Sequence, residues 1–97
     1  MEIARIKYLR YPKLTEIKAI DEPHKITIHL LDGGVIPSRL IDDYEAIESG
    51  DKLYQTGTLA NPDMLVIDMK EGSHQQIHLD KILKIDIEFN KPYNIPG

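Results

Sequence analysis

The chain has 97 residues, a formal net charge of −4 at pH 7 and no cysteine. This length suits a single domain, and the absence of cysteine excludes disulfides and thiolate-bound metals as sources of stability. No stretch has the apolar core of a signal peptide or the roughly 18 apolar residues of a membrane span, so we expect a cytoplasmic protein with no membrane partner. The excess of acidic residues argues against a dedicated nucleic-acid-binding protein.

Two short segments precede the middle of the chain. Residues 2–9 mix apolar and charged side chains, which predicts a strand at the edge of a sheet. Residues 13–20 place Leu14, Ile17 and Ile20 three apart, a spacing that also fits a helix. We interpret this segment as a strand, because threonine and isoleucine lie close to breaks at both ends, and keep the helix as the alternative.

The chain is organised around residues 25–41, which begin with alternating apolar and polar positions. Such a two-residue period is typical of a strand with one buried face. An Asp-Gly-Gly turn follows at residues 32–34, and glycine adopts the positive φ that a tight hairpin turn requires. The apolar character resumes at residues 35–36 and ends at Pro37, which has no amide hydrogen for pairing. The pattern predicts a β-hairpin.

After this hairpin the hydrophobic period changes. The apolar residues at positions 40, 41, 44 and 47 fall on one stripe of a helix. Ser38 is placed to accept hydrogen bonds from the amides of the first turn. Gly50 lies where a left-handed C-terminal cap belongs. We therefore predict one short helix at residues 39–49.

The following part of the chain has the composition of strands and turns. Residues 52–58 predict a strand, and residues 60–63 predict a turn. Residues 64–69 are almost continuously apolar, which predicts a central strand that is covered on both faces.

The cleanest alternation of apolar and polar positions lies in residues 75–89. A break at residues 80–82 divides this stretch into two predicted strands. The last eight residues contain two prolines and a terminal glycine. We therefore place a single β-rich domain at residues 1–89 and expect an irregular tail at residues 90–97.

The two hairpin regions resemble each other. Each has an apolar strand, an acidic residue before glycine, and a return strand with isoleucines five residues apart, Ile36 with Ile41 and Ile77 with Ile82. An internal duplication would give this pattern. Two unrelated β-hairpins would also give it, and we favour that second interpretation.

Together these segments predict a mainly β protein of the β-rich α+β class. Roughly seven or eight short strands, with glycine-containing turns and one short helix near 39–49, favour a small, strongly bent sheet or a barrel. The layout of the last strands resembles that of the Sm-like and SH3-like small barrels. The resemblance covers the layout alone, because no motif of those families is present, and it implies no functional residues.

No pattern in the sequence predicts an active site or a bound cofactor. His74 and His78 have the spacing of a helical metal site, but on a strand they lie about 13 Å apart, at roughly 3.3 Å per residue, too far to share one ion. The serines lack a nucleophile motif, and the glycine pair is too short to hold a phosphate. We therefore expect a non-enzymatic protein without a metal or a cofactor.

A compact basic and aromatic group lies near the N-terminus. It consists of Arg5, Lys7, Tyr8, Arg10, Tyr11 and Lys13. Tyrosine stacks on unpaired bases, and neighbouring cations neutralise phosphates. Binding of single-stranded nucleic acid is therefore one alternative function.

An acidic group lies on the predicted helix, at Asp42, Asp43, Glu45 and Glu48. A solvated helix face is the ordinary interpretation of such a group. A row of carboxylates also suits a partner-binding surface, as in inhibitors that occupy a basic groove of another protein. This acidic, inhibitor-like function is the second alternative.

The leading hypothesis is a non-enzymatic protein–protein interaction or accessory module of bacterial or phage type. Its expected partner is another protein or a second copy of itself, which makes a homo-oligomer one expected state. Residues 1–18 carry a net charge of +3 and residues 40–51 carry −5. The surface is therefore expected to have one basic region and one acidic region. The exposed edge strands of a small sheet are the expected docking surface.

Overall fold

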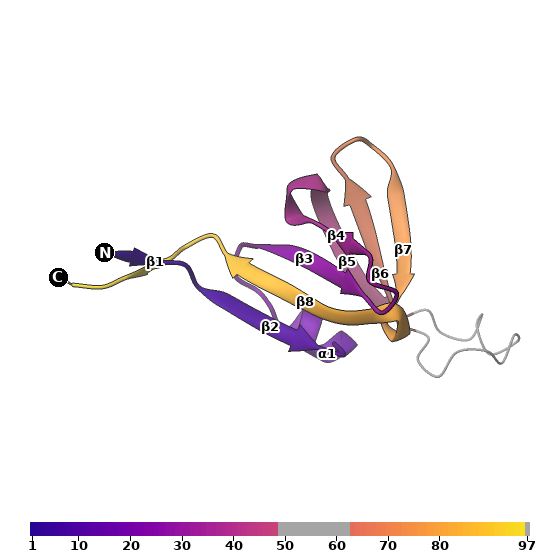
Figure 1. Ribbon diagram of the computed structural model, residues 1–97, viewed down its shortest axis with the longest axis horizontal. Coiled ribbons are helices and arrows are strands. Elements are labelled where there is room, and N and C mark those ends of the chain that lie inside the picture. The colour runs from indigo at the N-terminus through magenta and orange to yellow at the C-terminus, as the bar shows by residue number, and fades with distance from the viewer. Residues whose placement is uncertain (49–62, 97) are drawn as a thin grey trace, which may run out of the picture.

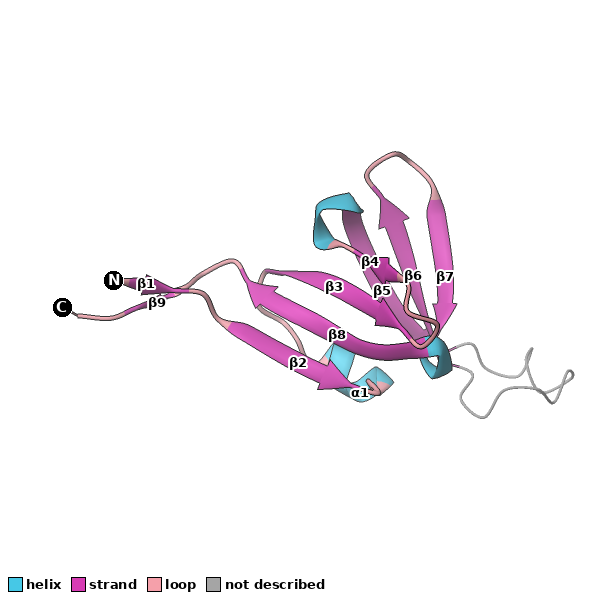
Figure 2. Ribbon diagram, viewed as in Figure 1, coloured by secondary structure: helices cyan, strands magenta, loops and turns pink. Residues whose placement is uncertain are grey.

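The computed structural model describes residues 1–48 and 63–96 (Figure 1). Strands predominate in this part of the chain, and short helical elements connect some of them (Figure 2). The strands are β1 (Glu2–Ile3), β2 (Ile6–Arg10), β3 (His24–Leu30), β4 (Val35–Ile36), β5 (Ile41–Glu48), β6 (Asp63–Met69), β7 (His74–His78), β8 (Ile82–Phe89) and β9 (Tyr93–Asn94). The helical elements are α1 (Leu14–Lys18) and the 3₁₀ turns η1 (Ser38–Leu40) and η3 (Leu79–Lys81). The prediction of a mainly β protein is confirmed.

The strands of the described residues form three antiparallel sheets. One sheet has the order β2-β8-β3-β4, a second has the order β5-β6-β7, and β1 pairs with β9 in a short ribbon. None of these sheets closes on itself within the described strands, so the Sm-like or SH3-like barrel is not confirmed. Two open sheets and a projecting ribbon take the place of the expected barrel (Figure 1).

The two hairpins belong to two matching units, and each unit gives its last strand to the other. The first unit runs through β3, β4, η1 and β5, and the second runs through β6, β7, η3 and β8. Strand β5 pairs with β6 of the second unit, and β8 pairs with β3 of the first. Each larger sheet therefore combines the hairpin of one unit with the third strand of the other.

The two units make equivalent backbone hydrogen bonds to each other where the chain leaves each hairpin strand. Leu31 N donates a hydrogen bond to Lys81 O at 2.9 Å, and Lys70 N donates one to Leu40 O at 2.9 Å. Each of these bonds joins the turn of one unit to the 3₁₀ turn of the other. This correspondence favours an internal duplication over two unrelated hairpins.

The turns of the two hairpins are built alike. Gly33 and Gly72 have φ values of 95° and 103°, which a side chain would strain. Their amides donate to the carbonyls of Leu30 and Met69, three residues earlier, at 3.1 and 2.9 Å. The hairpin predicted from the Asp-Gly-Gly turn is confirmed, and its pairing ends before Pro37 as expected.

One hydrophobic cluster unites both larger sheets and α1. Its fully buried large side chains are Ile28, Leu65, Ile67, Ile82, Ile85 and Ile87. Burial of each such side chain contributes about 1.5–3 kcal/mol relative to exposure. These residues come from β3, β6 and β8, which pair with strands of the other unit. Burial of their side chains therefore stabilises the pairing between the two units.

Strand β6 lies in the centre of its sheet, as predicted from residues 64–69. Only one of its faces is fully buried, because Leu65, Ile67 and Met69 are buried while the residues between them are half-buried. The strand predicted at 52–58 lies outside the described residues. So does the turn predicted at 60–63, except for its last residue, which begins β6.

Residues 14–18 form the helix α1, so the alternative interpretation of this segment is confirmed and the preferred strand is wrong. Lys13 N donates to Glu16 Oε1 at 3.0 Å, which satisfies a backbone donor at the start of the helix. Ile17 is buried, and α1 packs against β5. The three-residue spacing of the apolar positions was therefore the decisive signal.

The short helix predicted at 39–49 is wrong. Its place is taken by η1, which ends at Leu40, and by β5, which begins at Ile41. Ser38 starts the 3₁₀ turn, and no side chain caps that turn. Pairing with β6 along the whole of β5 decides in favour of the strand.

A β-bulge explains why this segment imitates a helix. Ile41 lies opposite Met69 and Tyr44 lies opposite Ile67, although Asp42 adds an extra residue between the paired positions. Both partners on β6 are buried, so residues three apart in β5 face the same core. An apolar spacing of three residues is thus produced by a bulged strand, and β8 has an equivalent bulge beside β3.

Part of the tail at residues 90–97 is regular, contrary to the prediction. Tyr93 and Asn94 form β9 and pair with Ile3 and Glu2 of β1. This ribbon projects from the body of the molecule and carries both termini (Figure 1). Met1 donates from its amino group to the carbonyl of Ile95, and Ile95 N donates back to Met1 O at 2.8 Å, so two further bonds extend the ribbon.

Candidate interaction surface

One long side of β2 has no strand partner in the described part of the chain. On the other side, Phe89 N donates to Arg5 O at 2.9 Å, and Tyr11 N donates to Leu83 O at 2.8 Å. Backbone groups alternate in direction along an antiparallel strand. The odd-numbered residues of β2 therefore bond to β8, and the even-numbered residues turn their N–H and C=O groups outward.

The outward-facing residues are Ile6, Tyr8 and Arg10, and they define the free edge of β2. A row of open backbone groups is a template for pairing with another strand. Ile6 and Tyr8 also expose 50% and 61% of their surface, so two large side chains lie uncovered on the same face beside this edge. Tyr11, with a φ of 49°, and the buried Pro12 end the edge.

The outer face of the sheet beside this edge has a charged centre at Asp86, which lies opposite Tyr8. Asp86 Oδ2 and His29 Nε2 form a hydrogen bond of 2.8 Å, and Lys84 Nζ lies 3.4 Å from Asp86 Oδ1. The same ammonium group lies 5.2 Å from the centre of the Tyr8 ring, a cation–π distance. A hollow of about 190 Å³ opens here beside Ile6 and Tyr8.

Two other edges of the described sheets are less suited to pairing. On β5, Tyr44 N donates to the side chain of Asp43 at 2.8 Å, which satisfies an outward donor, and α1 packs against this strand. On β7, the exposed residues are His74, Gln75 and Gln76, and none is a large apolar side chain. The edge of β2 combines open backbone groups with exposed apolar surface.

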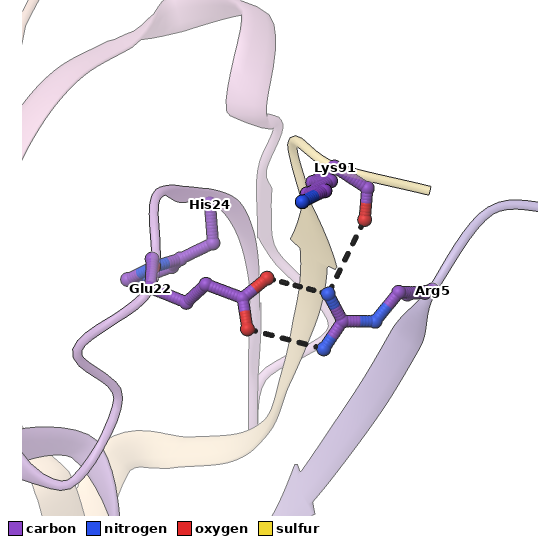
Figure 3. Close-up of polar contacts among 4 residues, drawn as sticks. All are labelled: Arg5, Glu22, His24 and Lys91. Carbon is purple, nitrogen blue, oxygen red and sulfur yellow. Dashed lines mark hydrogen bonds and ion pairs between the residues drawn. The ribbon is translucent and has the colours of Figure 1, made fainter. Parts of the chain in front are cut away.

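A second group of contacts lies just before β2 (Figure 3). Arg5 donates two hydrogen bonds to the carboxylate of Glu22, at 2.5 and 3.1 Å, and a third to the carbonyl of Lys91 at 3.3 Å. Its guanidinium lies 4.7 Å from the ring centre of Phe89 and 5.1 Å from that of Tyr93. One side chain therefore connects the start of β2 to the ends of two other segments.

The paired charges shift both pKa values. Hydrogen bonds from Arg5 lower the pKa of Glu22, and the Glu22 carboxylate raises the pKa of Arg5. The two side chains expose 23% and 39% of their surface, so water screens the pair. Because the Glu22 carboxylate holds its guanidinium and offsets its charge, Arg5 is poorly placed to bind a phosphate.

An aromatic cluster closes the end of the core near this arginine. His24 Nδ1 donates to Glu22 O at 2.5 Å, and its Nε2 forms a hydrogen bond with the hydroxyl of Tyr44. The rings of Tyr44 and Phe89 meet His24 edge-on, at centroid distances of 5.7 and 6.2 Å. Burial raises the pKa of Tyr44, and the charge of Asp43 raises it further, so the phenol stays protonated.

A cavity of about 680 Å³ opens beside the aromatic cluster. Its charged lining consists of Lys25, Arg39, Lys70, Asp21, Glu22, Asp42 and Asp43. The mixture of signs selects no single class of charged ligand. Both ring nitrogens of His24 are occupied by hydrogen bonds, so this histidine offers no free base for catalysis.

The structure divides the residues predicted to bind nucleic acid. Tyr8 and Arg10 point to the outer face of their sheet, whereas Lys7 points to the opposite face. Arg5 is held by Glu22, and Lys13 is exposed at the start of α1. The group that is compact in sequence therefore spans two faces and a turn.

The four predicted acidic partner residues are all exposed, on β5 rather than on a helix. Asp43 and Glu45 lie on one face of the strand, and Glu48 lies on the other. Asp42 occupies the bulge between the two registers. The carboxylates therefore do not form a single row.

The predicted histidine pair of β7 has separate surroundings. His74 Nδ1 lies 2.6 Å from Asp68 Oδ1 on the neighbouring strand, and His78 lies at the other end of β7. Among the described residues, no three His, Asp or Glu side chains meet at a position for a metal ion. None of the helices described in the structure has the length and hydropathy needed to cross a bilayer.

Sequence reasoning missed two residues that organise these contacts. Asp86 is one of the even-numbered polar positions in the clean alternation of β8, and that alternation identifies its face without identifying its partners. Glu22 looks like a turn residue, and its contact with Arg5 leaves no local pattern in the sequence. The contacts of Asp86 with Tyr8 and of Glu22 with Arg5 become visible only when segments far apart in the sequence are paired.

Comparison with known proteins found no match to this chain among family models, curated proteins or solved structures.

Proposed function

We propose that the protein is a non-enzymatic protein–protein interaction module that receives an extended segment of its partner along the free edge of β2. The observation that carries this proposal is the row of outward N–H and C=O groups at Ile6, Tyr8 and Arg10. In strand addition, main-chain hydrogen bonds supply affinity and alternate side chains supply specificity. The exposed side chains of Ile6 and Tyr8 add apolar contact area to such a docking site.

The edge suits a short segment with charges of both signs. Strand β2 has five residues, and Pro12 limits any longer pairing. On the outer face, Arg10 lies opposite Lys84 at one end, and Glu88 lies opposite Ile6 at the other. A partner strand with an acidic and a basic end complements this distribution.

A proline substitution tests the role of the backbone. Tyr8→Pro removes an outward N–H and leaves the bonds between β2 and β8 in place, because proline is tolerated where the strand faces solvent. Tyr8→Ala is the matched control, since it removes the ring and keeps the N–H. We expect immobilised wild-type protein to retain a partner that the proline variant loses. The alanine variant, which lacks only the contact of the ring, should still retain it, more weakly than the wild type.

Two results would contradict the proposal. One is equal retention of the partner by all three proteins, which would place the contact elsewhere. The other is turnover of a substrate by the purified protein.

Binding of single-stranded nucleic acid is the second candidate function. Its support is the pair of tyrosines at the end of β2, because Tyr11 exposes 63% of its surface and Tyr8 is similarly exposed beside Arg10. Asp86 and Glu88 on the same face repel phosphates, which ranks this function second.

A further inference from the structure

We propose that the partner of the free edge is a second copy of this chain, whose β2 pairs antiparallel with the first about a two-fold axis. This inference rests on the proposed function and names its partner. The two β2-β8-β3-β4 sheets then become one continuous sheet across the axis.

Backbone geometry selects the register of this pairing. The outward groups belong to even-numbered residues in both copies, so each bonded pair must join two even-numbered residues. With Tyr8 opposite Tyr8 of the second copy, Ile6 lies opposite Arg10, and all three outward residues are paired. About six backbone hydrogen bonds form in this register, and a shift by two residues loses part of them.

The charges of the outer face fit the same register. In one copy the end of β2 near Arg10 is basic, because Lys84 lies opposite it on β8. The other end, near Ile6, has Glu88 opposite it on β8. A two-fold axis through Tyr8 reverses one copy, so each basic end meets an acidic end, and the complementarity occurs twice.

The apolar surface of the edge is also covered by this pairing. Ile6 and Tyr8 point to the outer face of their own sheet, and the two-fold axis places those of the second copy on the same face. The two Tyr8 rings then face each other as a cross-strand aromatic pair. Half-exposed apolar side chains on an open edge are therefore explained by the dimer.

Charge reversal tests the register directly. We expect the wild type to be a dimer by light-scattering chromatography, and Arg10→Glu or Glu88→Arg alone to raise the dissociation constant about tenfold or more. The double variant Arg10→Glu/Glu88→Arg restores the opposite-sign contacts and is expected to recover the dimer. Within one copy Glu88 lies on β8 opposite Ile6, four positions along the sheet from Arg10 and at least about 13 Å away at roughly 3.3 Å per residue, so recovery reports contact between copies.

The proline variant supplies an independent measurement. Tyr8→Pro is expected to be a folded monomer, with the circular dichroism spectrum of the wild type, while Tyr8→Ala still dimerises. A wild type that stays monomeric at every concentration overturns the inference. In that case the proposed function still stands if Tyr8→Pro abolishes capture of a different protein.

A dimer that persists through both charge reversals and Tyr8→Pro also overturns the inference, because its interface must then lie elsewhere. Failure of the proposed function itself is recognised separately, by a partner that all edge variants retain.

Discussion

Arg5 and Phe89 are joined through both their main chains and their side chains. Phe89 N donates to Arg5 O at 2.9 Å, and the Arg5 guanidinium lies 4.7 Å from the centre of the Phe89 ring. Glu22 holds the same guanidinium with two hydrogen bonds. The beginning of β2 is thereby fixed to the end of β8 and to the segment that leads into β3, which sets the position of the free edge.

Substitution of Arg5 is expected to lower the midpoint of thermal unfolding. Arg5→Ala should have the larger effect, and Arg5→Lys should recover part of it, because lysine keeps the charge but lacks the planar fork that binds a carboxylate and stacks on a ring. Thermal unfolding followed by circular dichroism measures the difference. Lys7→Ala is the control, since Lys7 is exposed on the same strand and takes no part in the proposed contact between copies, and equal midpoints for Arg5→Lys and the wild type would show that charge alone is sufficient.

The ion pair also predicts a dependence of stability on pH. Arg5 lowers the pKa of Glu22 in the folded protein, so the pair stabilises the fold above the pKa of an unfolded glutamate, about 4.3. This stabilisation is lost as pH falls through the lowered folded-state pKa. We expect urea unfolding below about pH 5 to depend less steeply on pH in Glu22→Gln than in the wild type. Parallel curves for the two proteins would speak against the ion pair.

Ile28 and Ile67 occupy corresponding positions in the two units, and neither exposes any surface. Their replacement by alanine is expected to cost about 2–5 kcal/mol each in the free energy of unfolding, with similar values for the two sites. Leu31→Ala is the matched control, because this side chain is 52% exposed and its loss should cost about 0.5 kcal/mol or less. A large effect at only one of the two isoleucines would contradict a core shared equally by both units.

The hairpin turns allow a similar comparison. Gly33→Ala and Gly72→Ala each force a side chain into positive φ, and each should destabilise the protein by about 1–2 kcal/mol. The added Cβ atoms meet no neighbouring atom within 4 Å, so the cost reports backbone strain rather than a clash. Chemical unfolding of both variants provides the values, and Gly33→Asn should be milder because asparagine tolerates positive φ. An unchanged stability would show that the turns relax.

The alternative function makes its own prediction. If the protein binds single-stranded nucleic acid, fluorescence anisotropy of a labelled oligonucleotide should rise on titration, and affinity should fall steeply with added salt. Tyr8→Ala and Tyr11→Ala should each cost about 1–3 kcal/mol of binding, whereas Tyr93→Ala on the ribbon should leave it unchanged. If the anisotropy stays constant on titration at low salt, the protein does not bind single-stranded nucleic acid.

Local patterns were sufficient to predict the strands with a regular alternation. The hairpin with its Asp-Gly-Gly turn and the last long strands needed only neighbouring residues, because glycine and a two-residue period act over short distances. The segment at 39–49 misled this reasoning, since the bulge at Asp42 gives a strand the apolar spacing of a helix. A bulge depends on the opposite strand, which the sequence of one strand does not contain.

The candidate site was predictable only in part. The basic and aromatic segment around Tyr8 was recognised, and its expected position at a sheet edge agrees with the structure. Which face of β2 is buried, and which of its backbone groups are left without a partner on β8, depends on the pairing of these two strands. That pairing joins the two ends of the chain, and it also brings Asp86 beside Tyr8, so neither could follow from local spacing.

Because each unit supplies the third strand of the other, neither half of the chain can complete a sheet alone. Strand β3 ends at Leu30, yet its long neighbour β8 begins only at Ile82. During synthesis the first hairpin must therefore wait, with one side open, until nearly the whole chain has emerged. Pairings between distant segments slow folding and prolong exposure of strand edges to aggregation. We expect the two sheets to form late and together, in a single cooperative step.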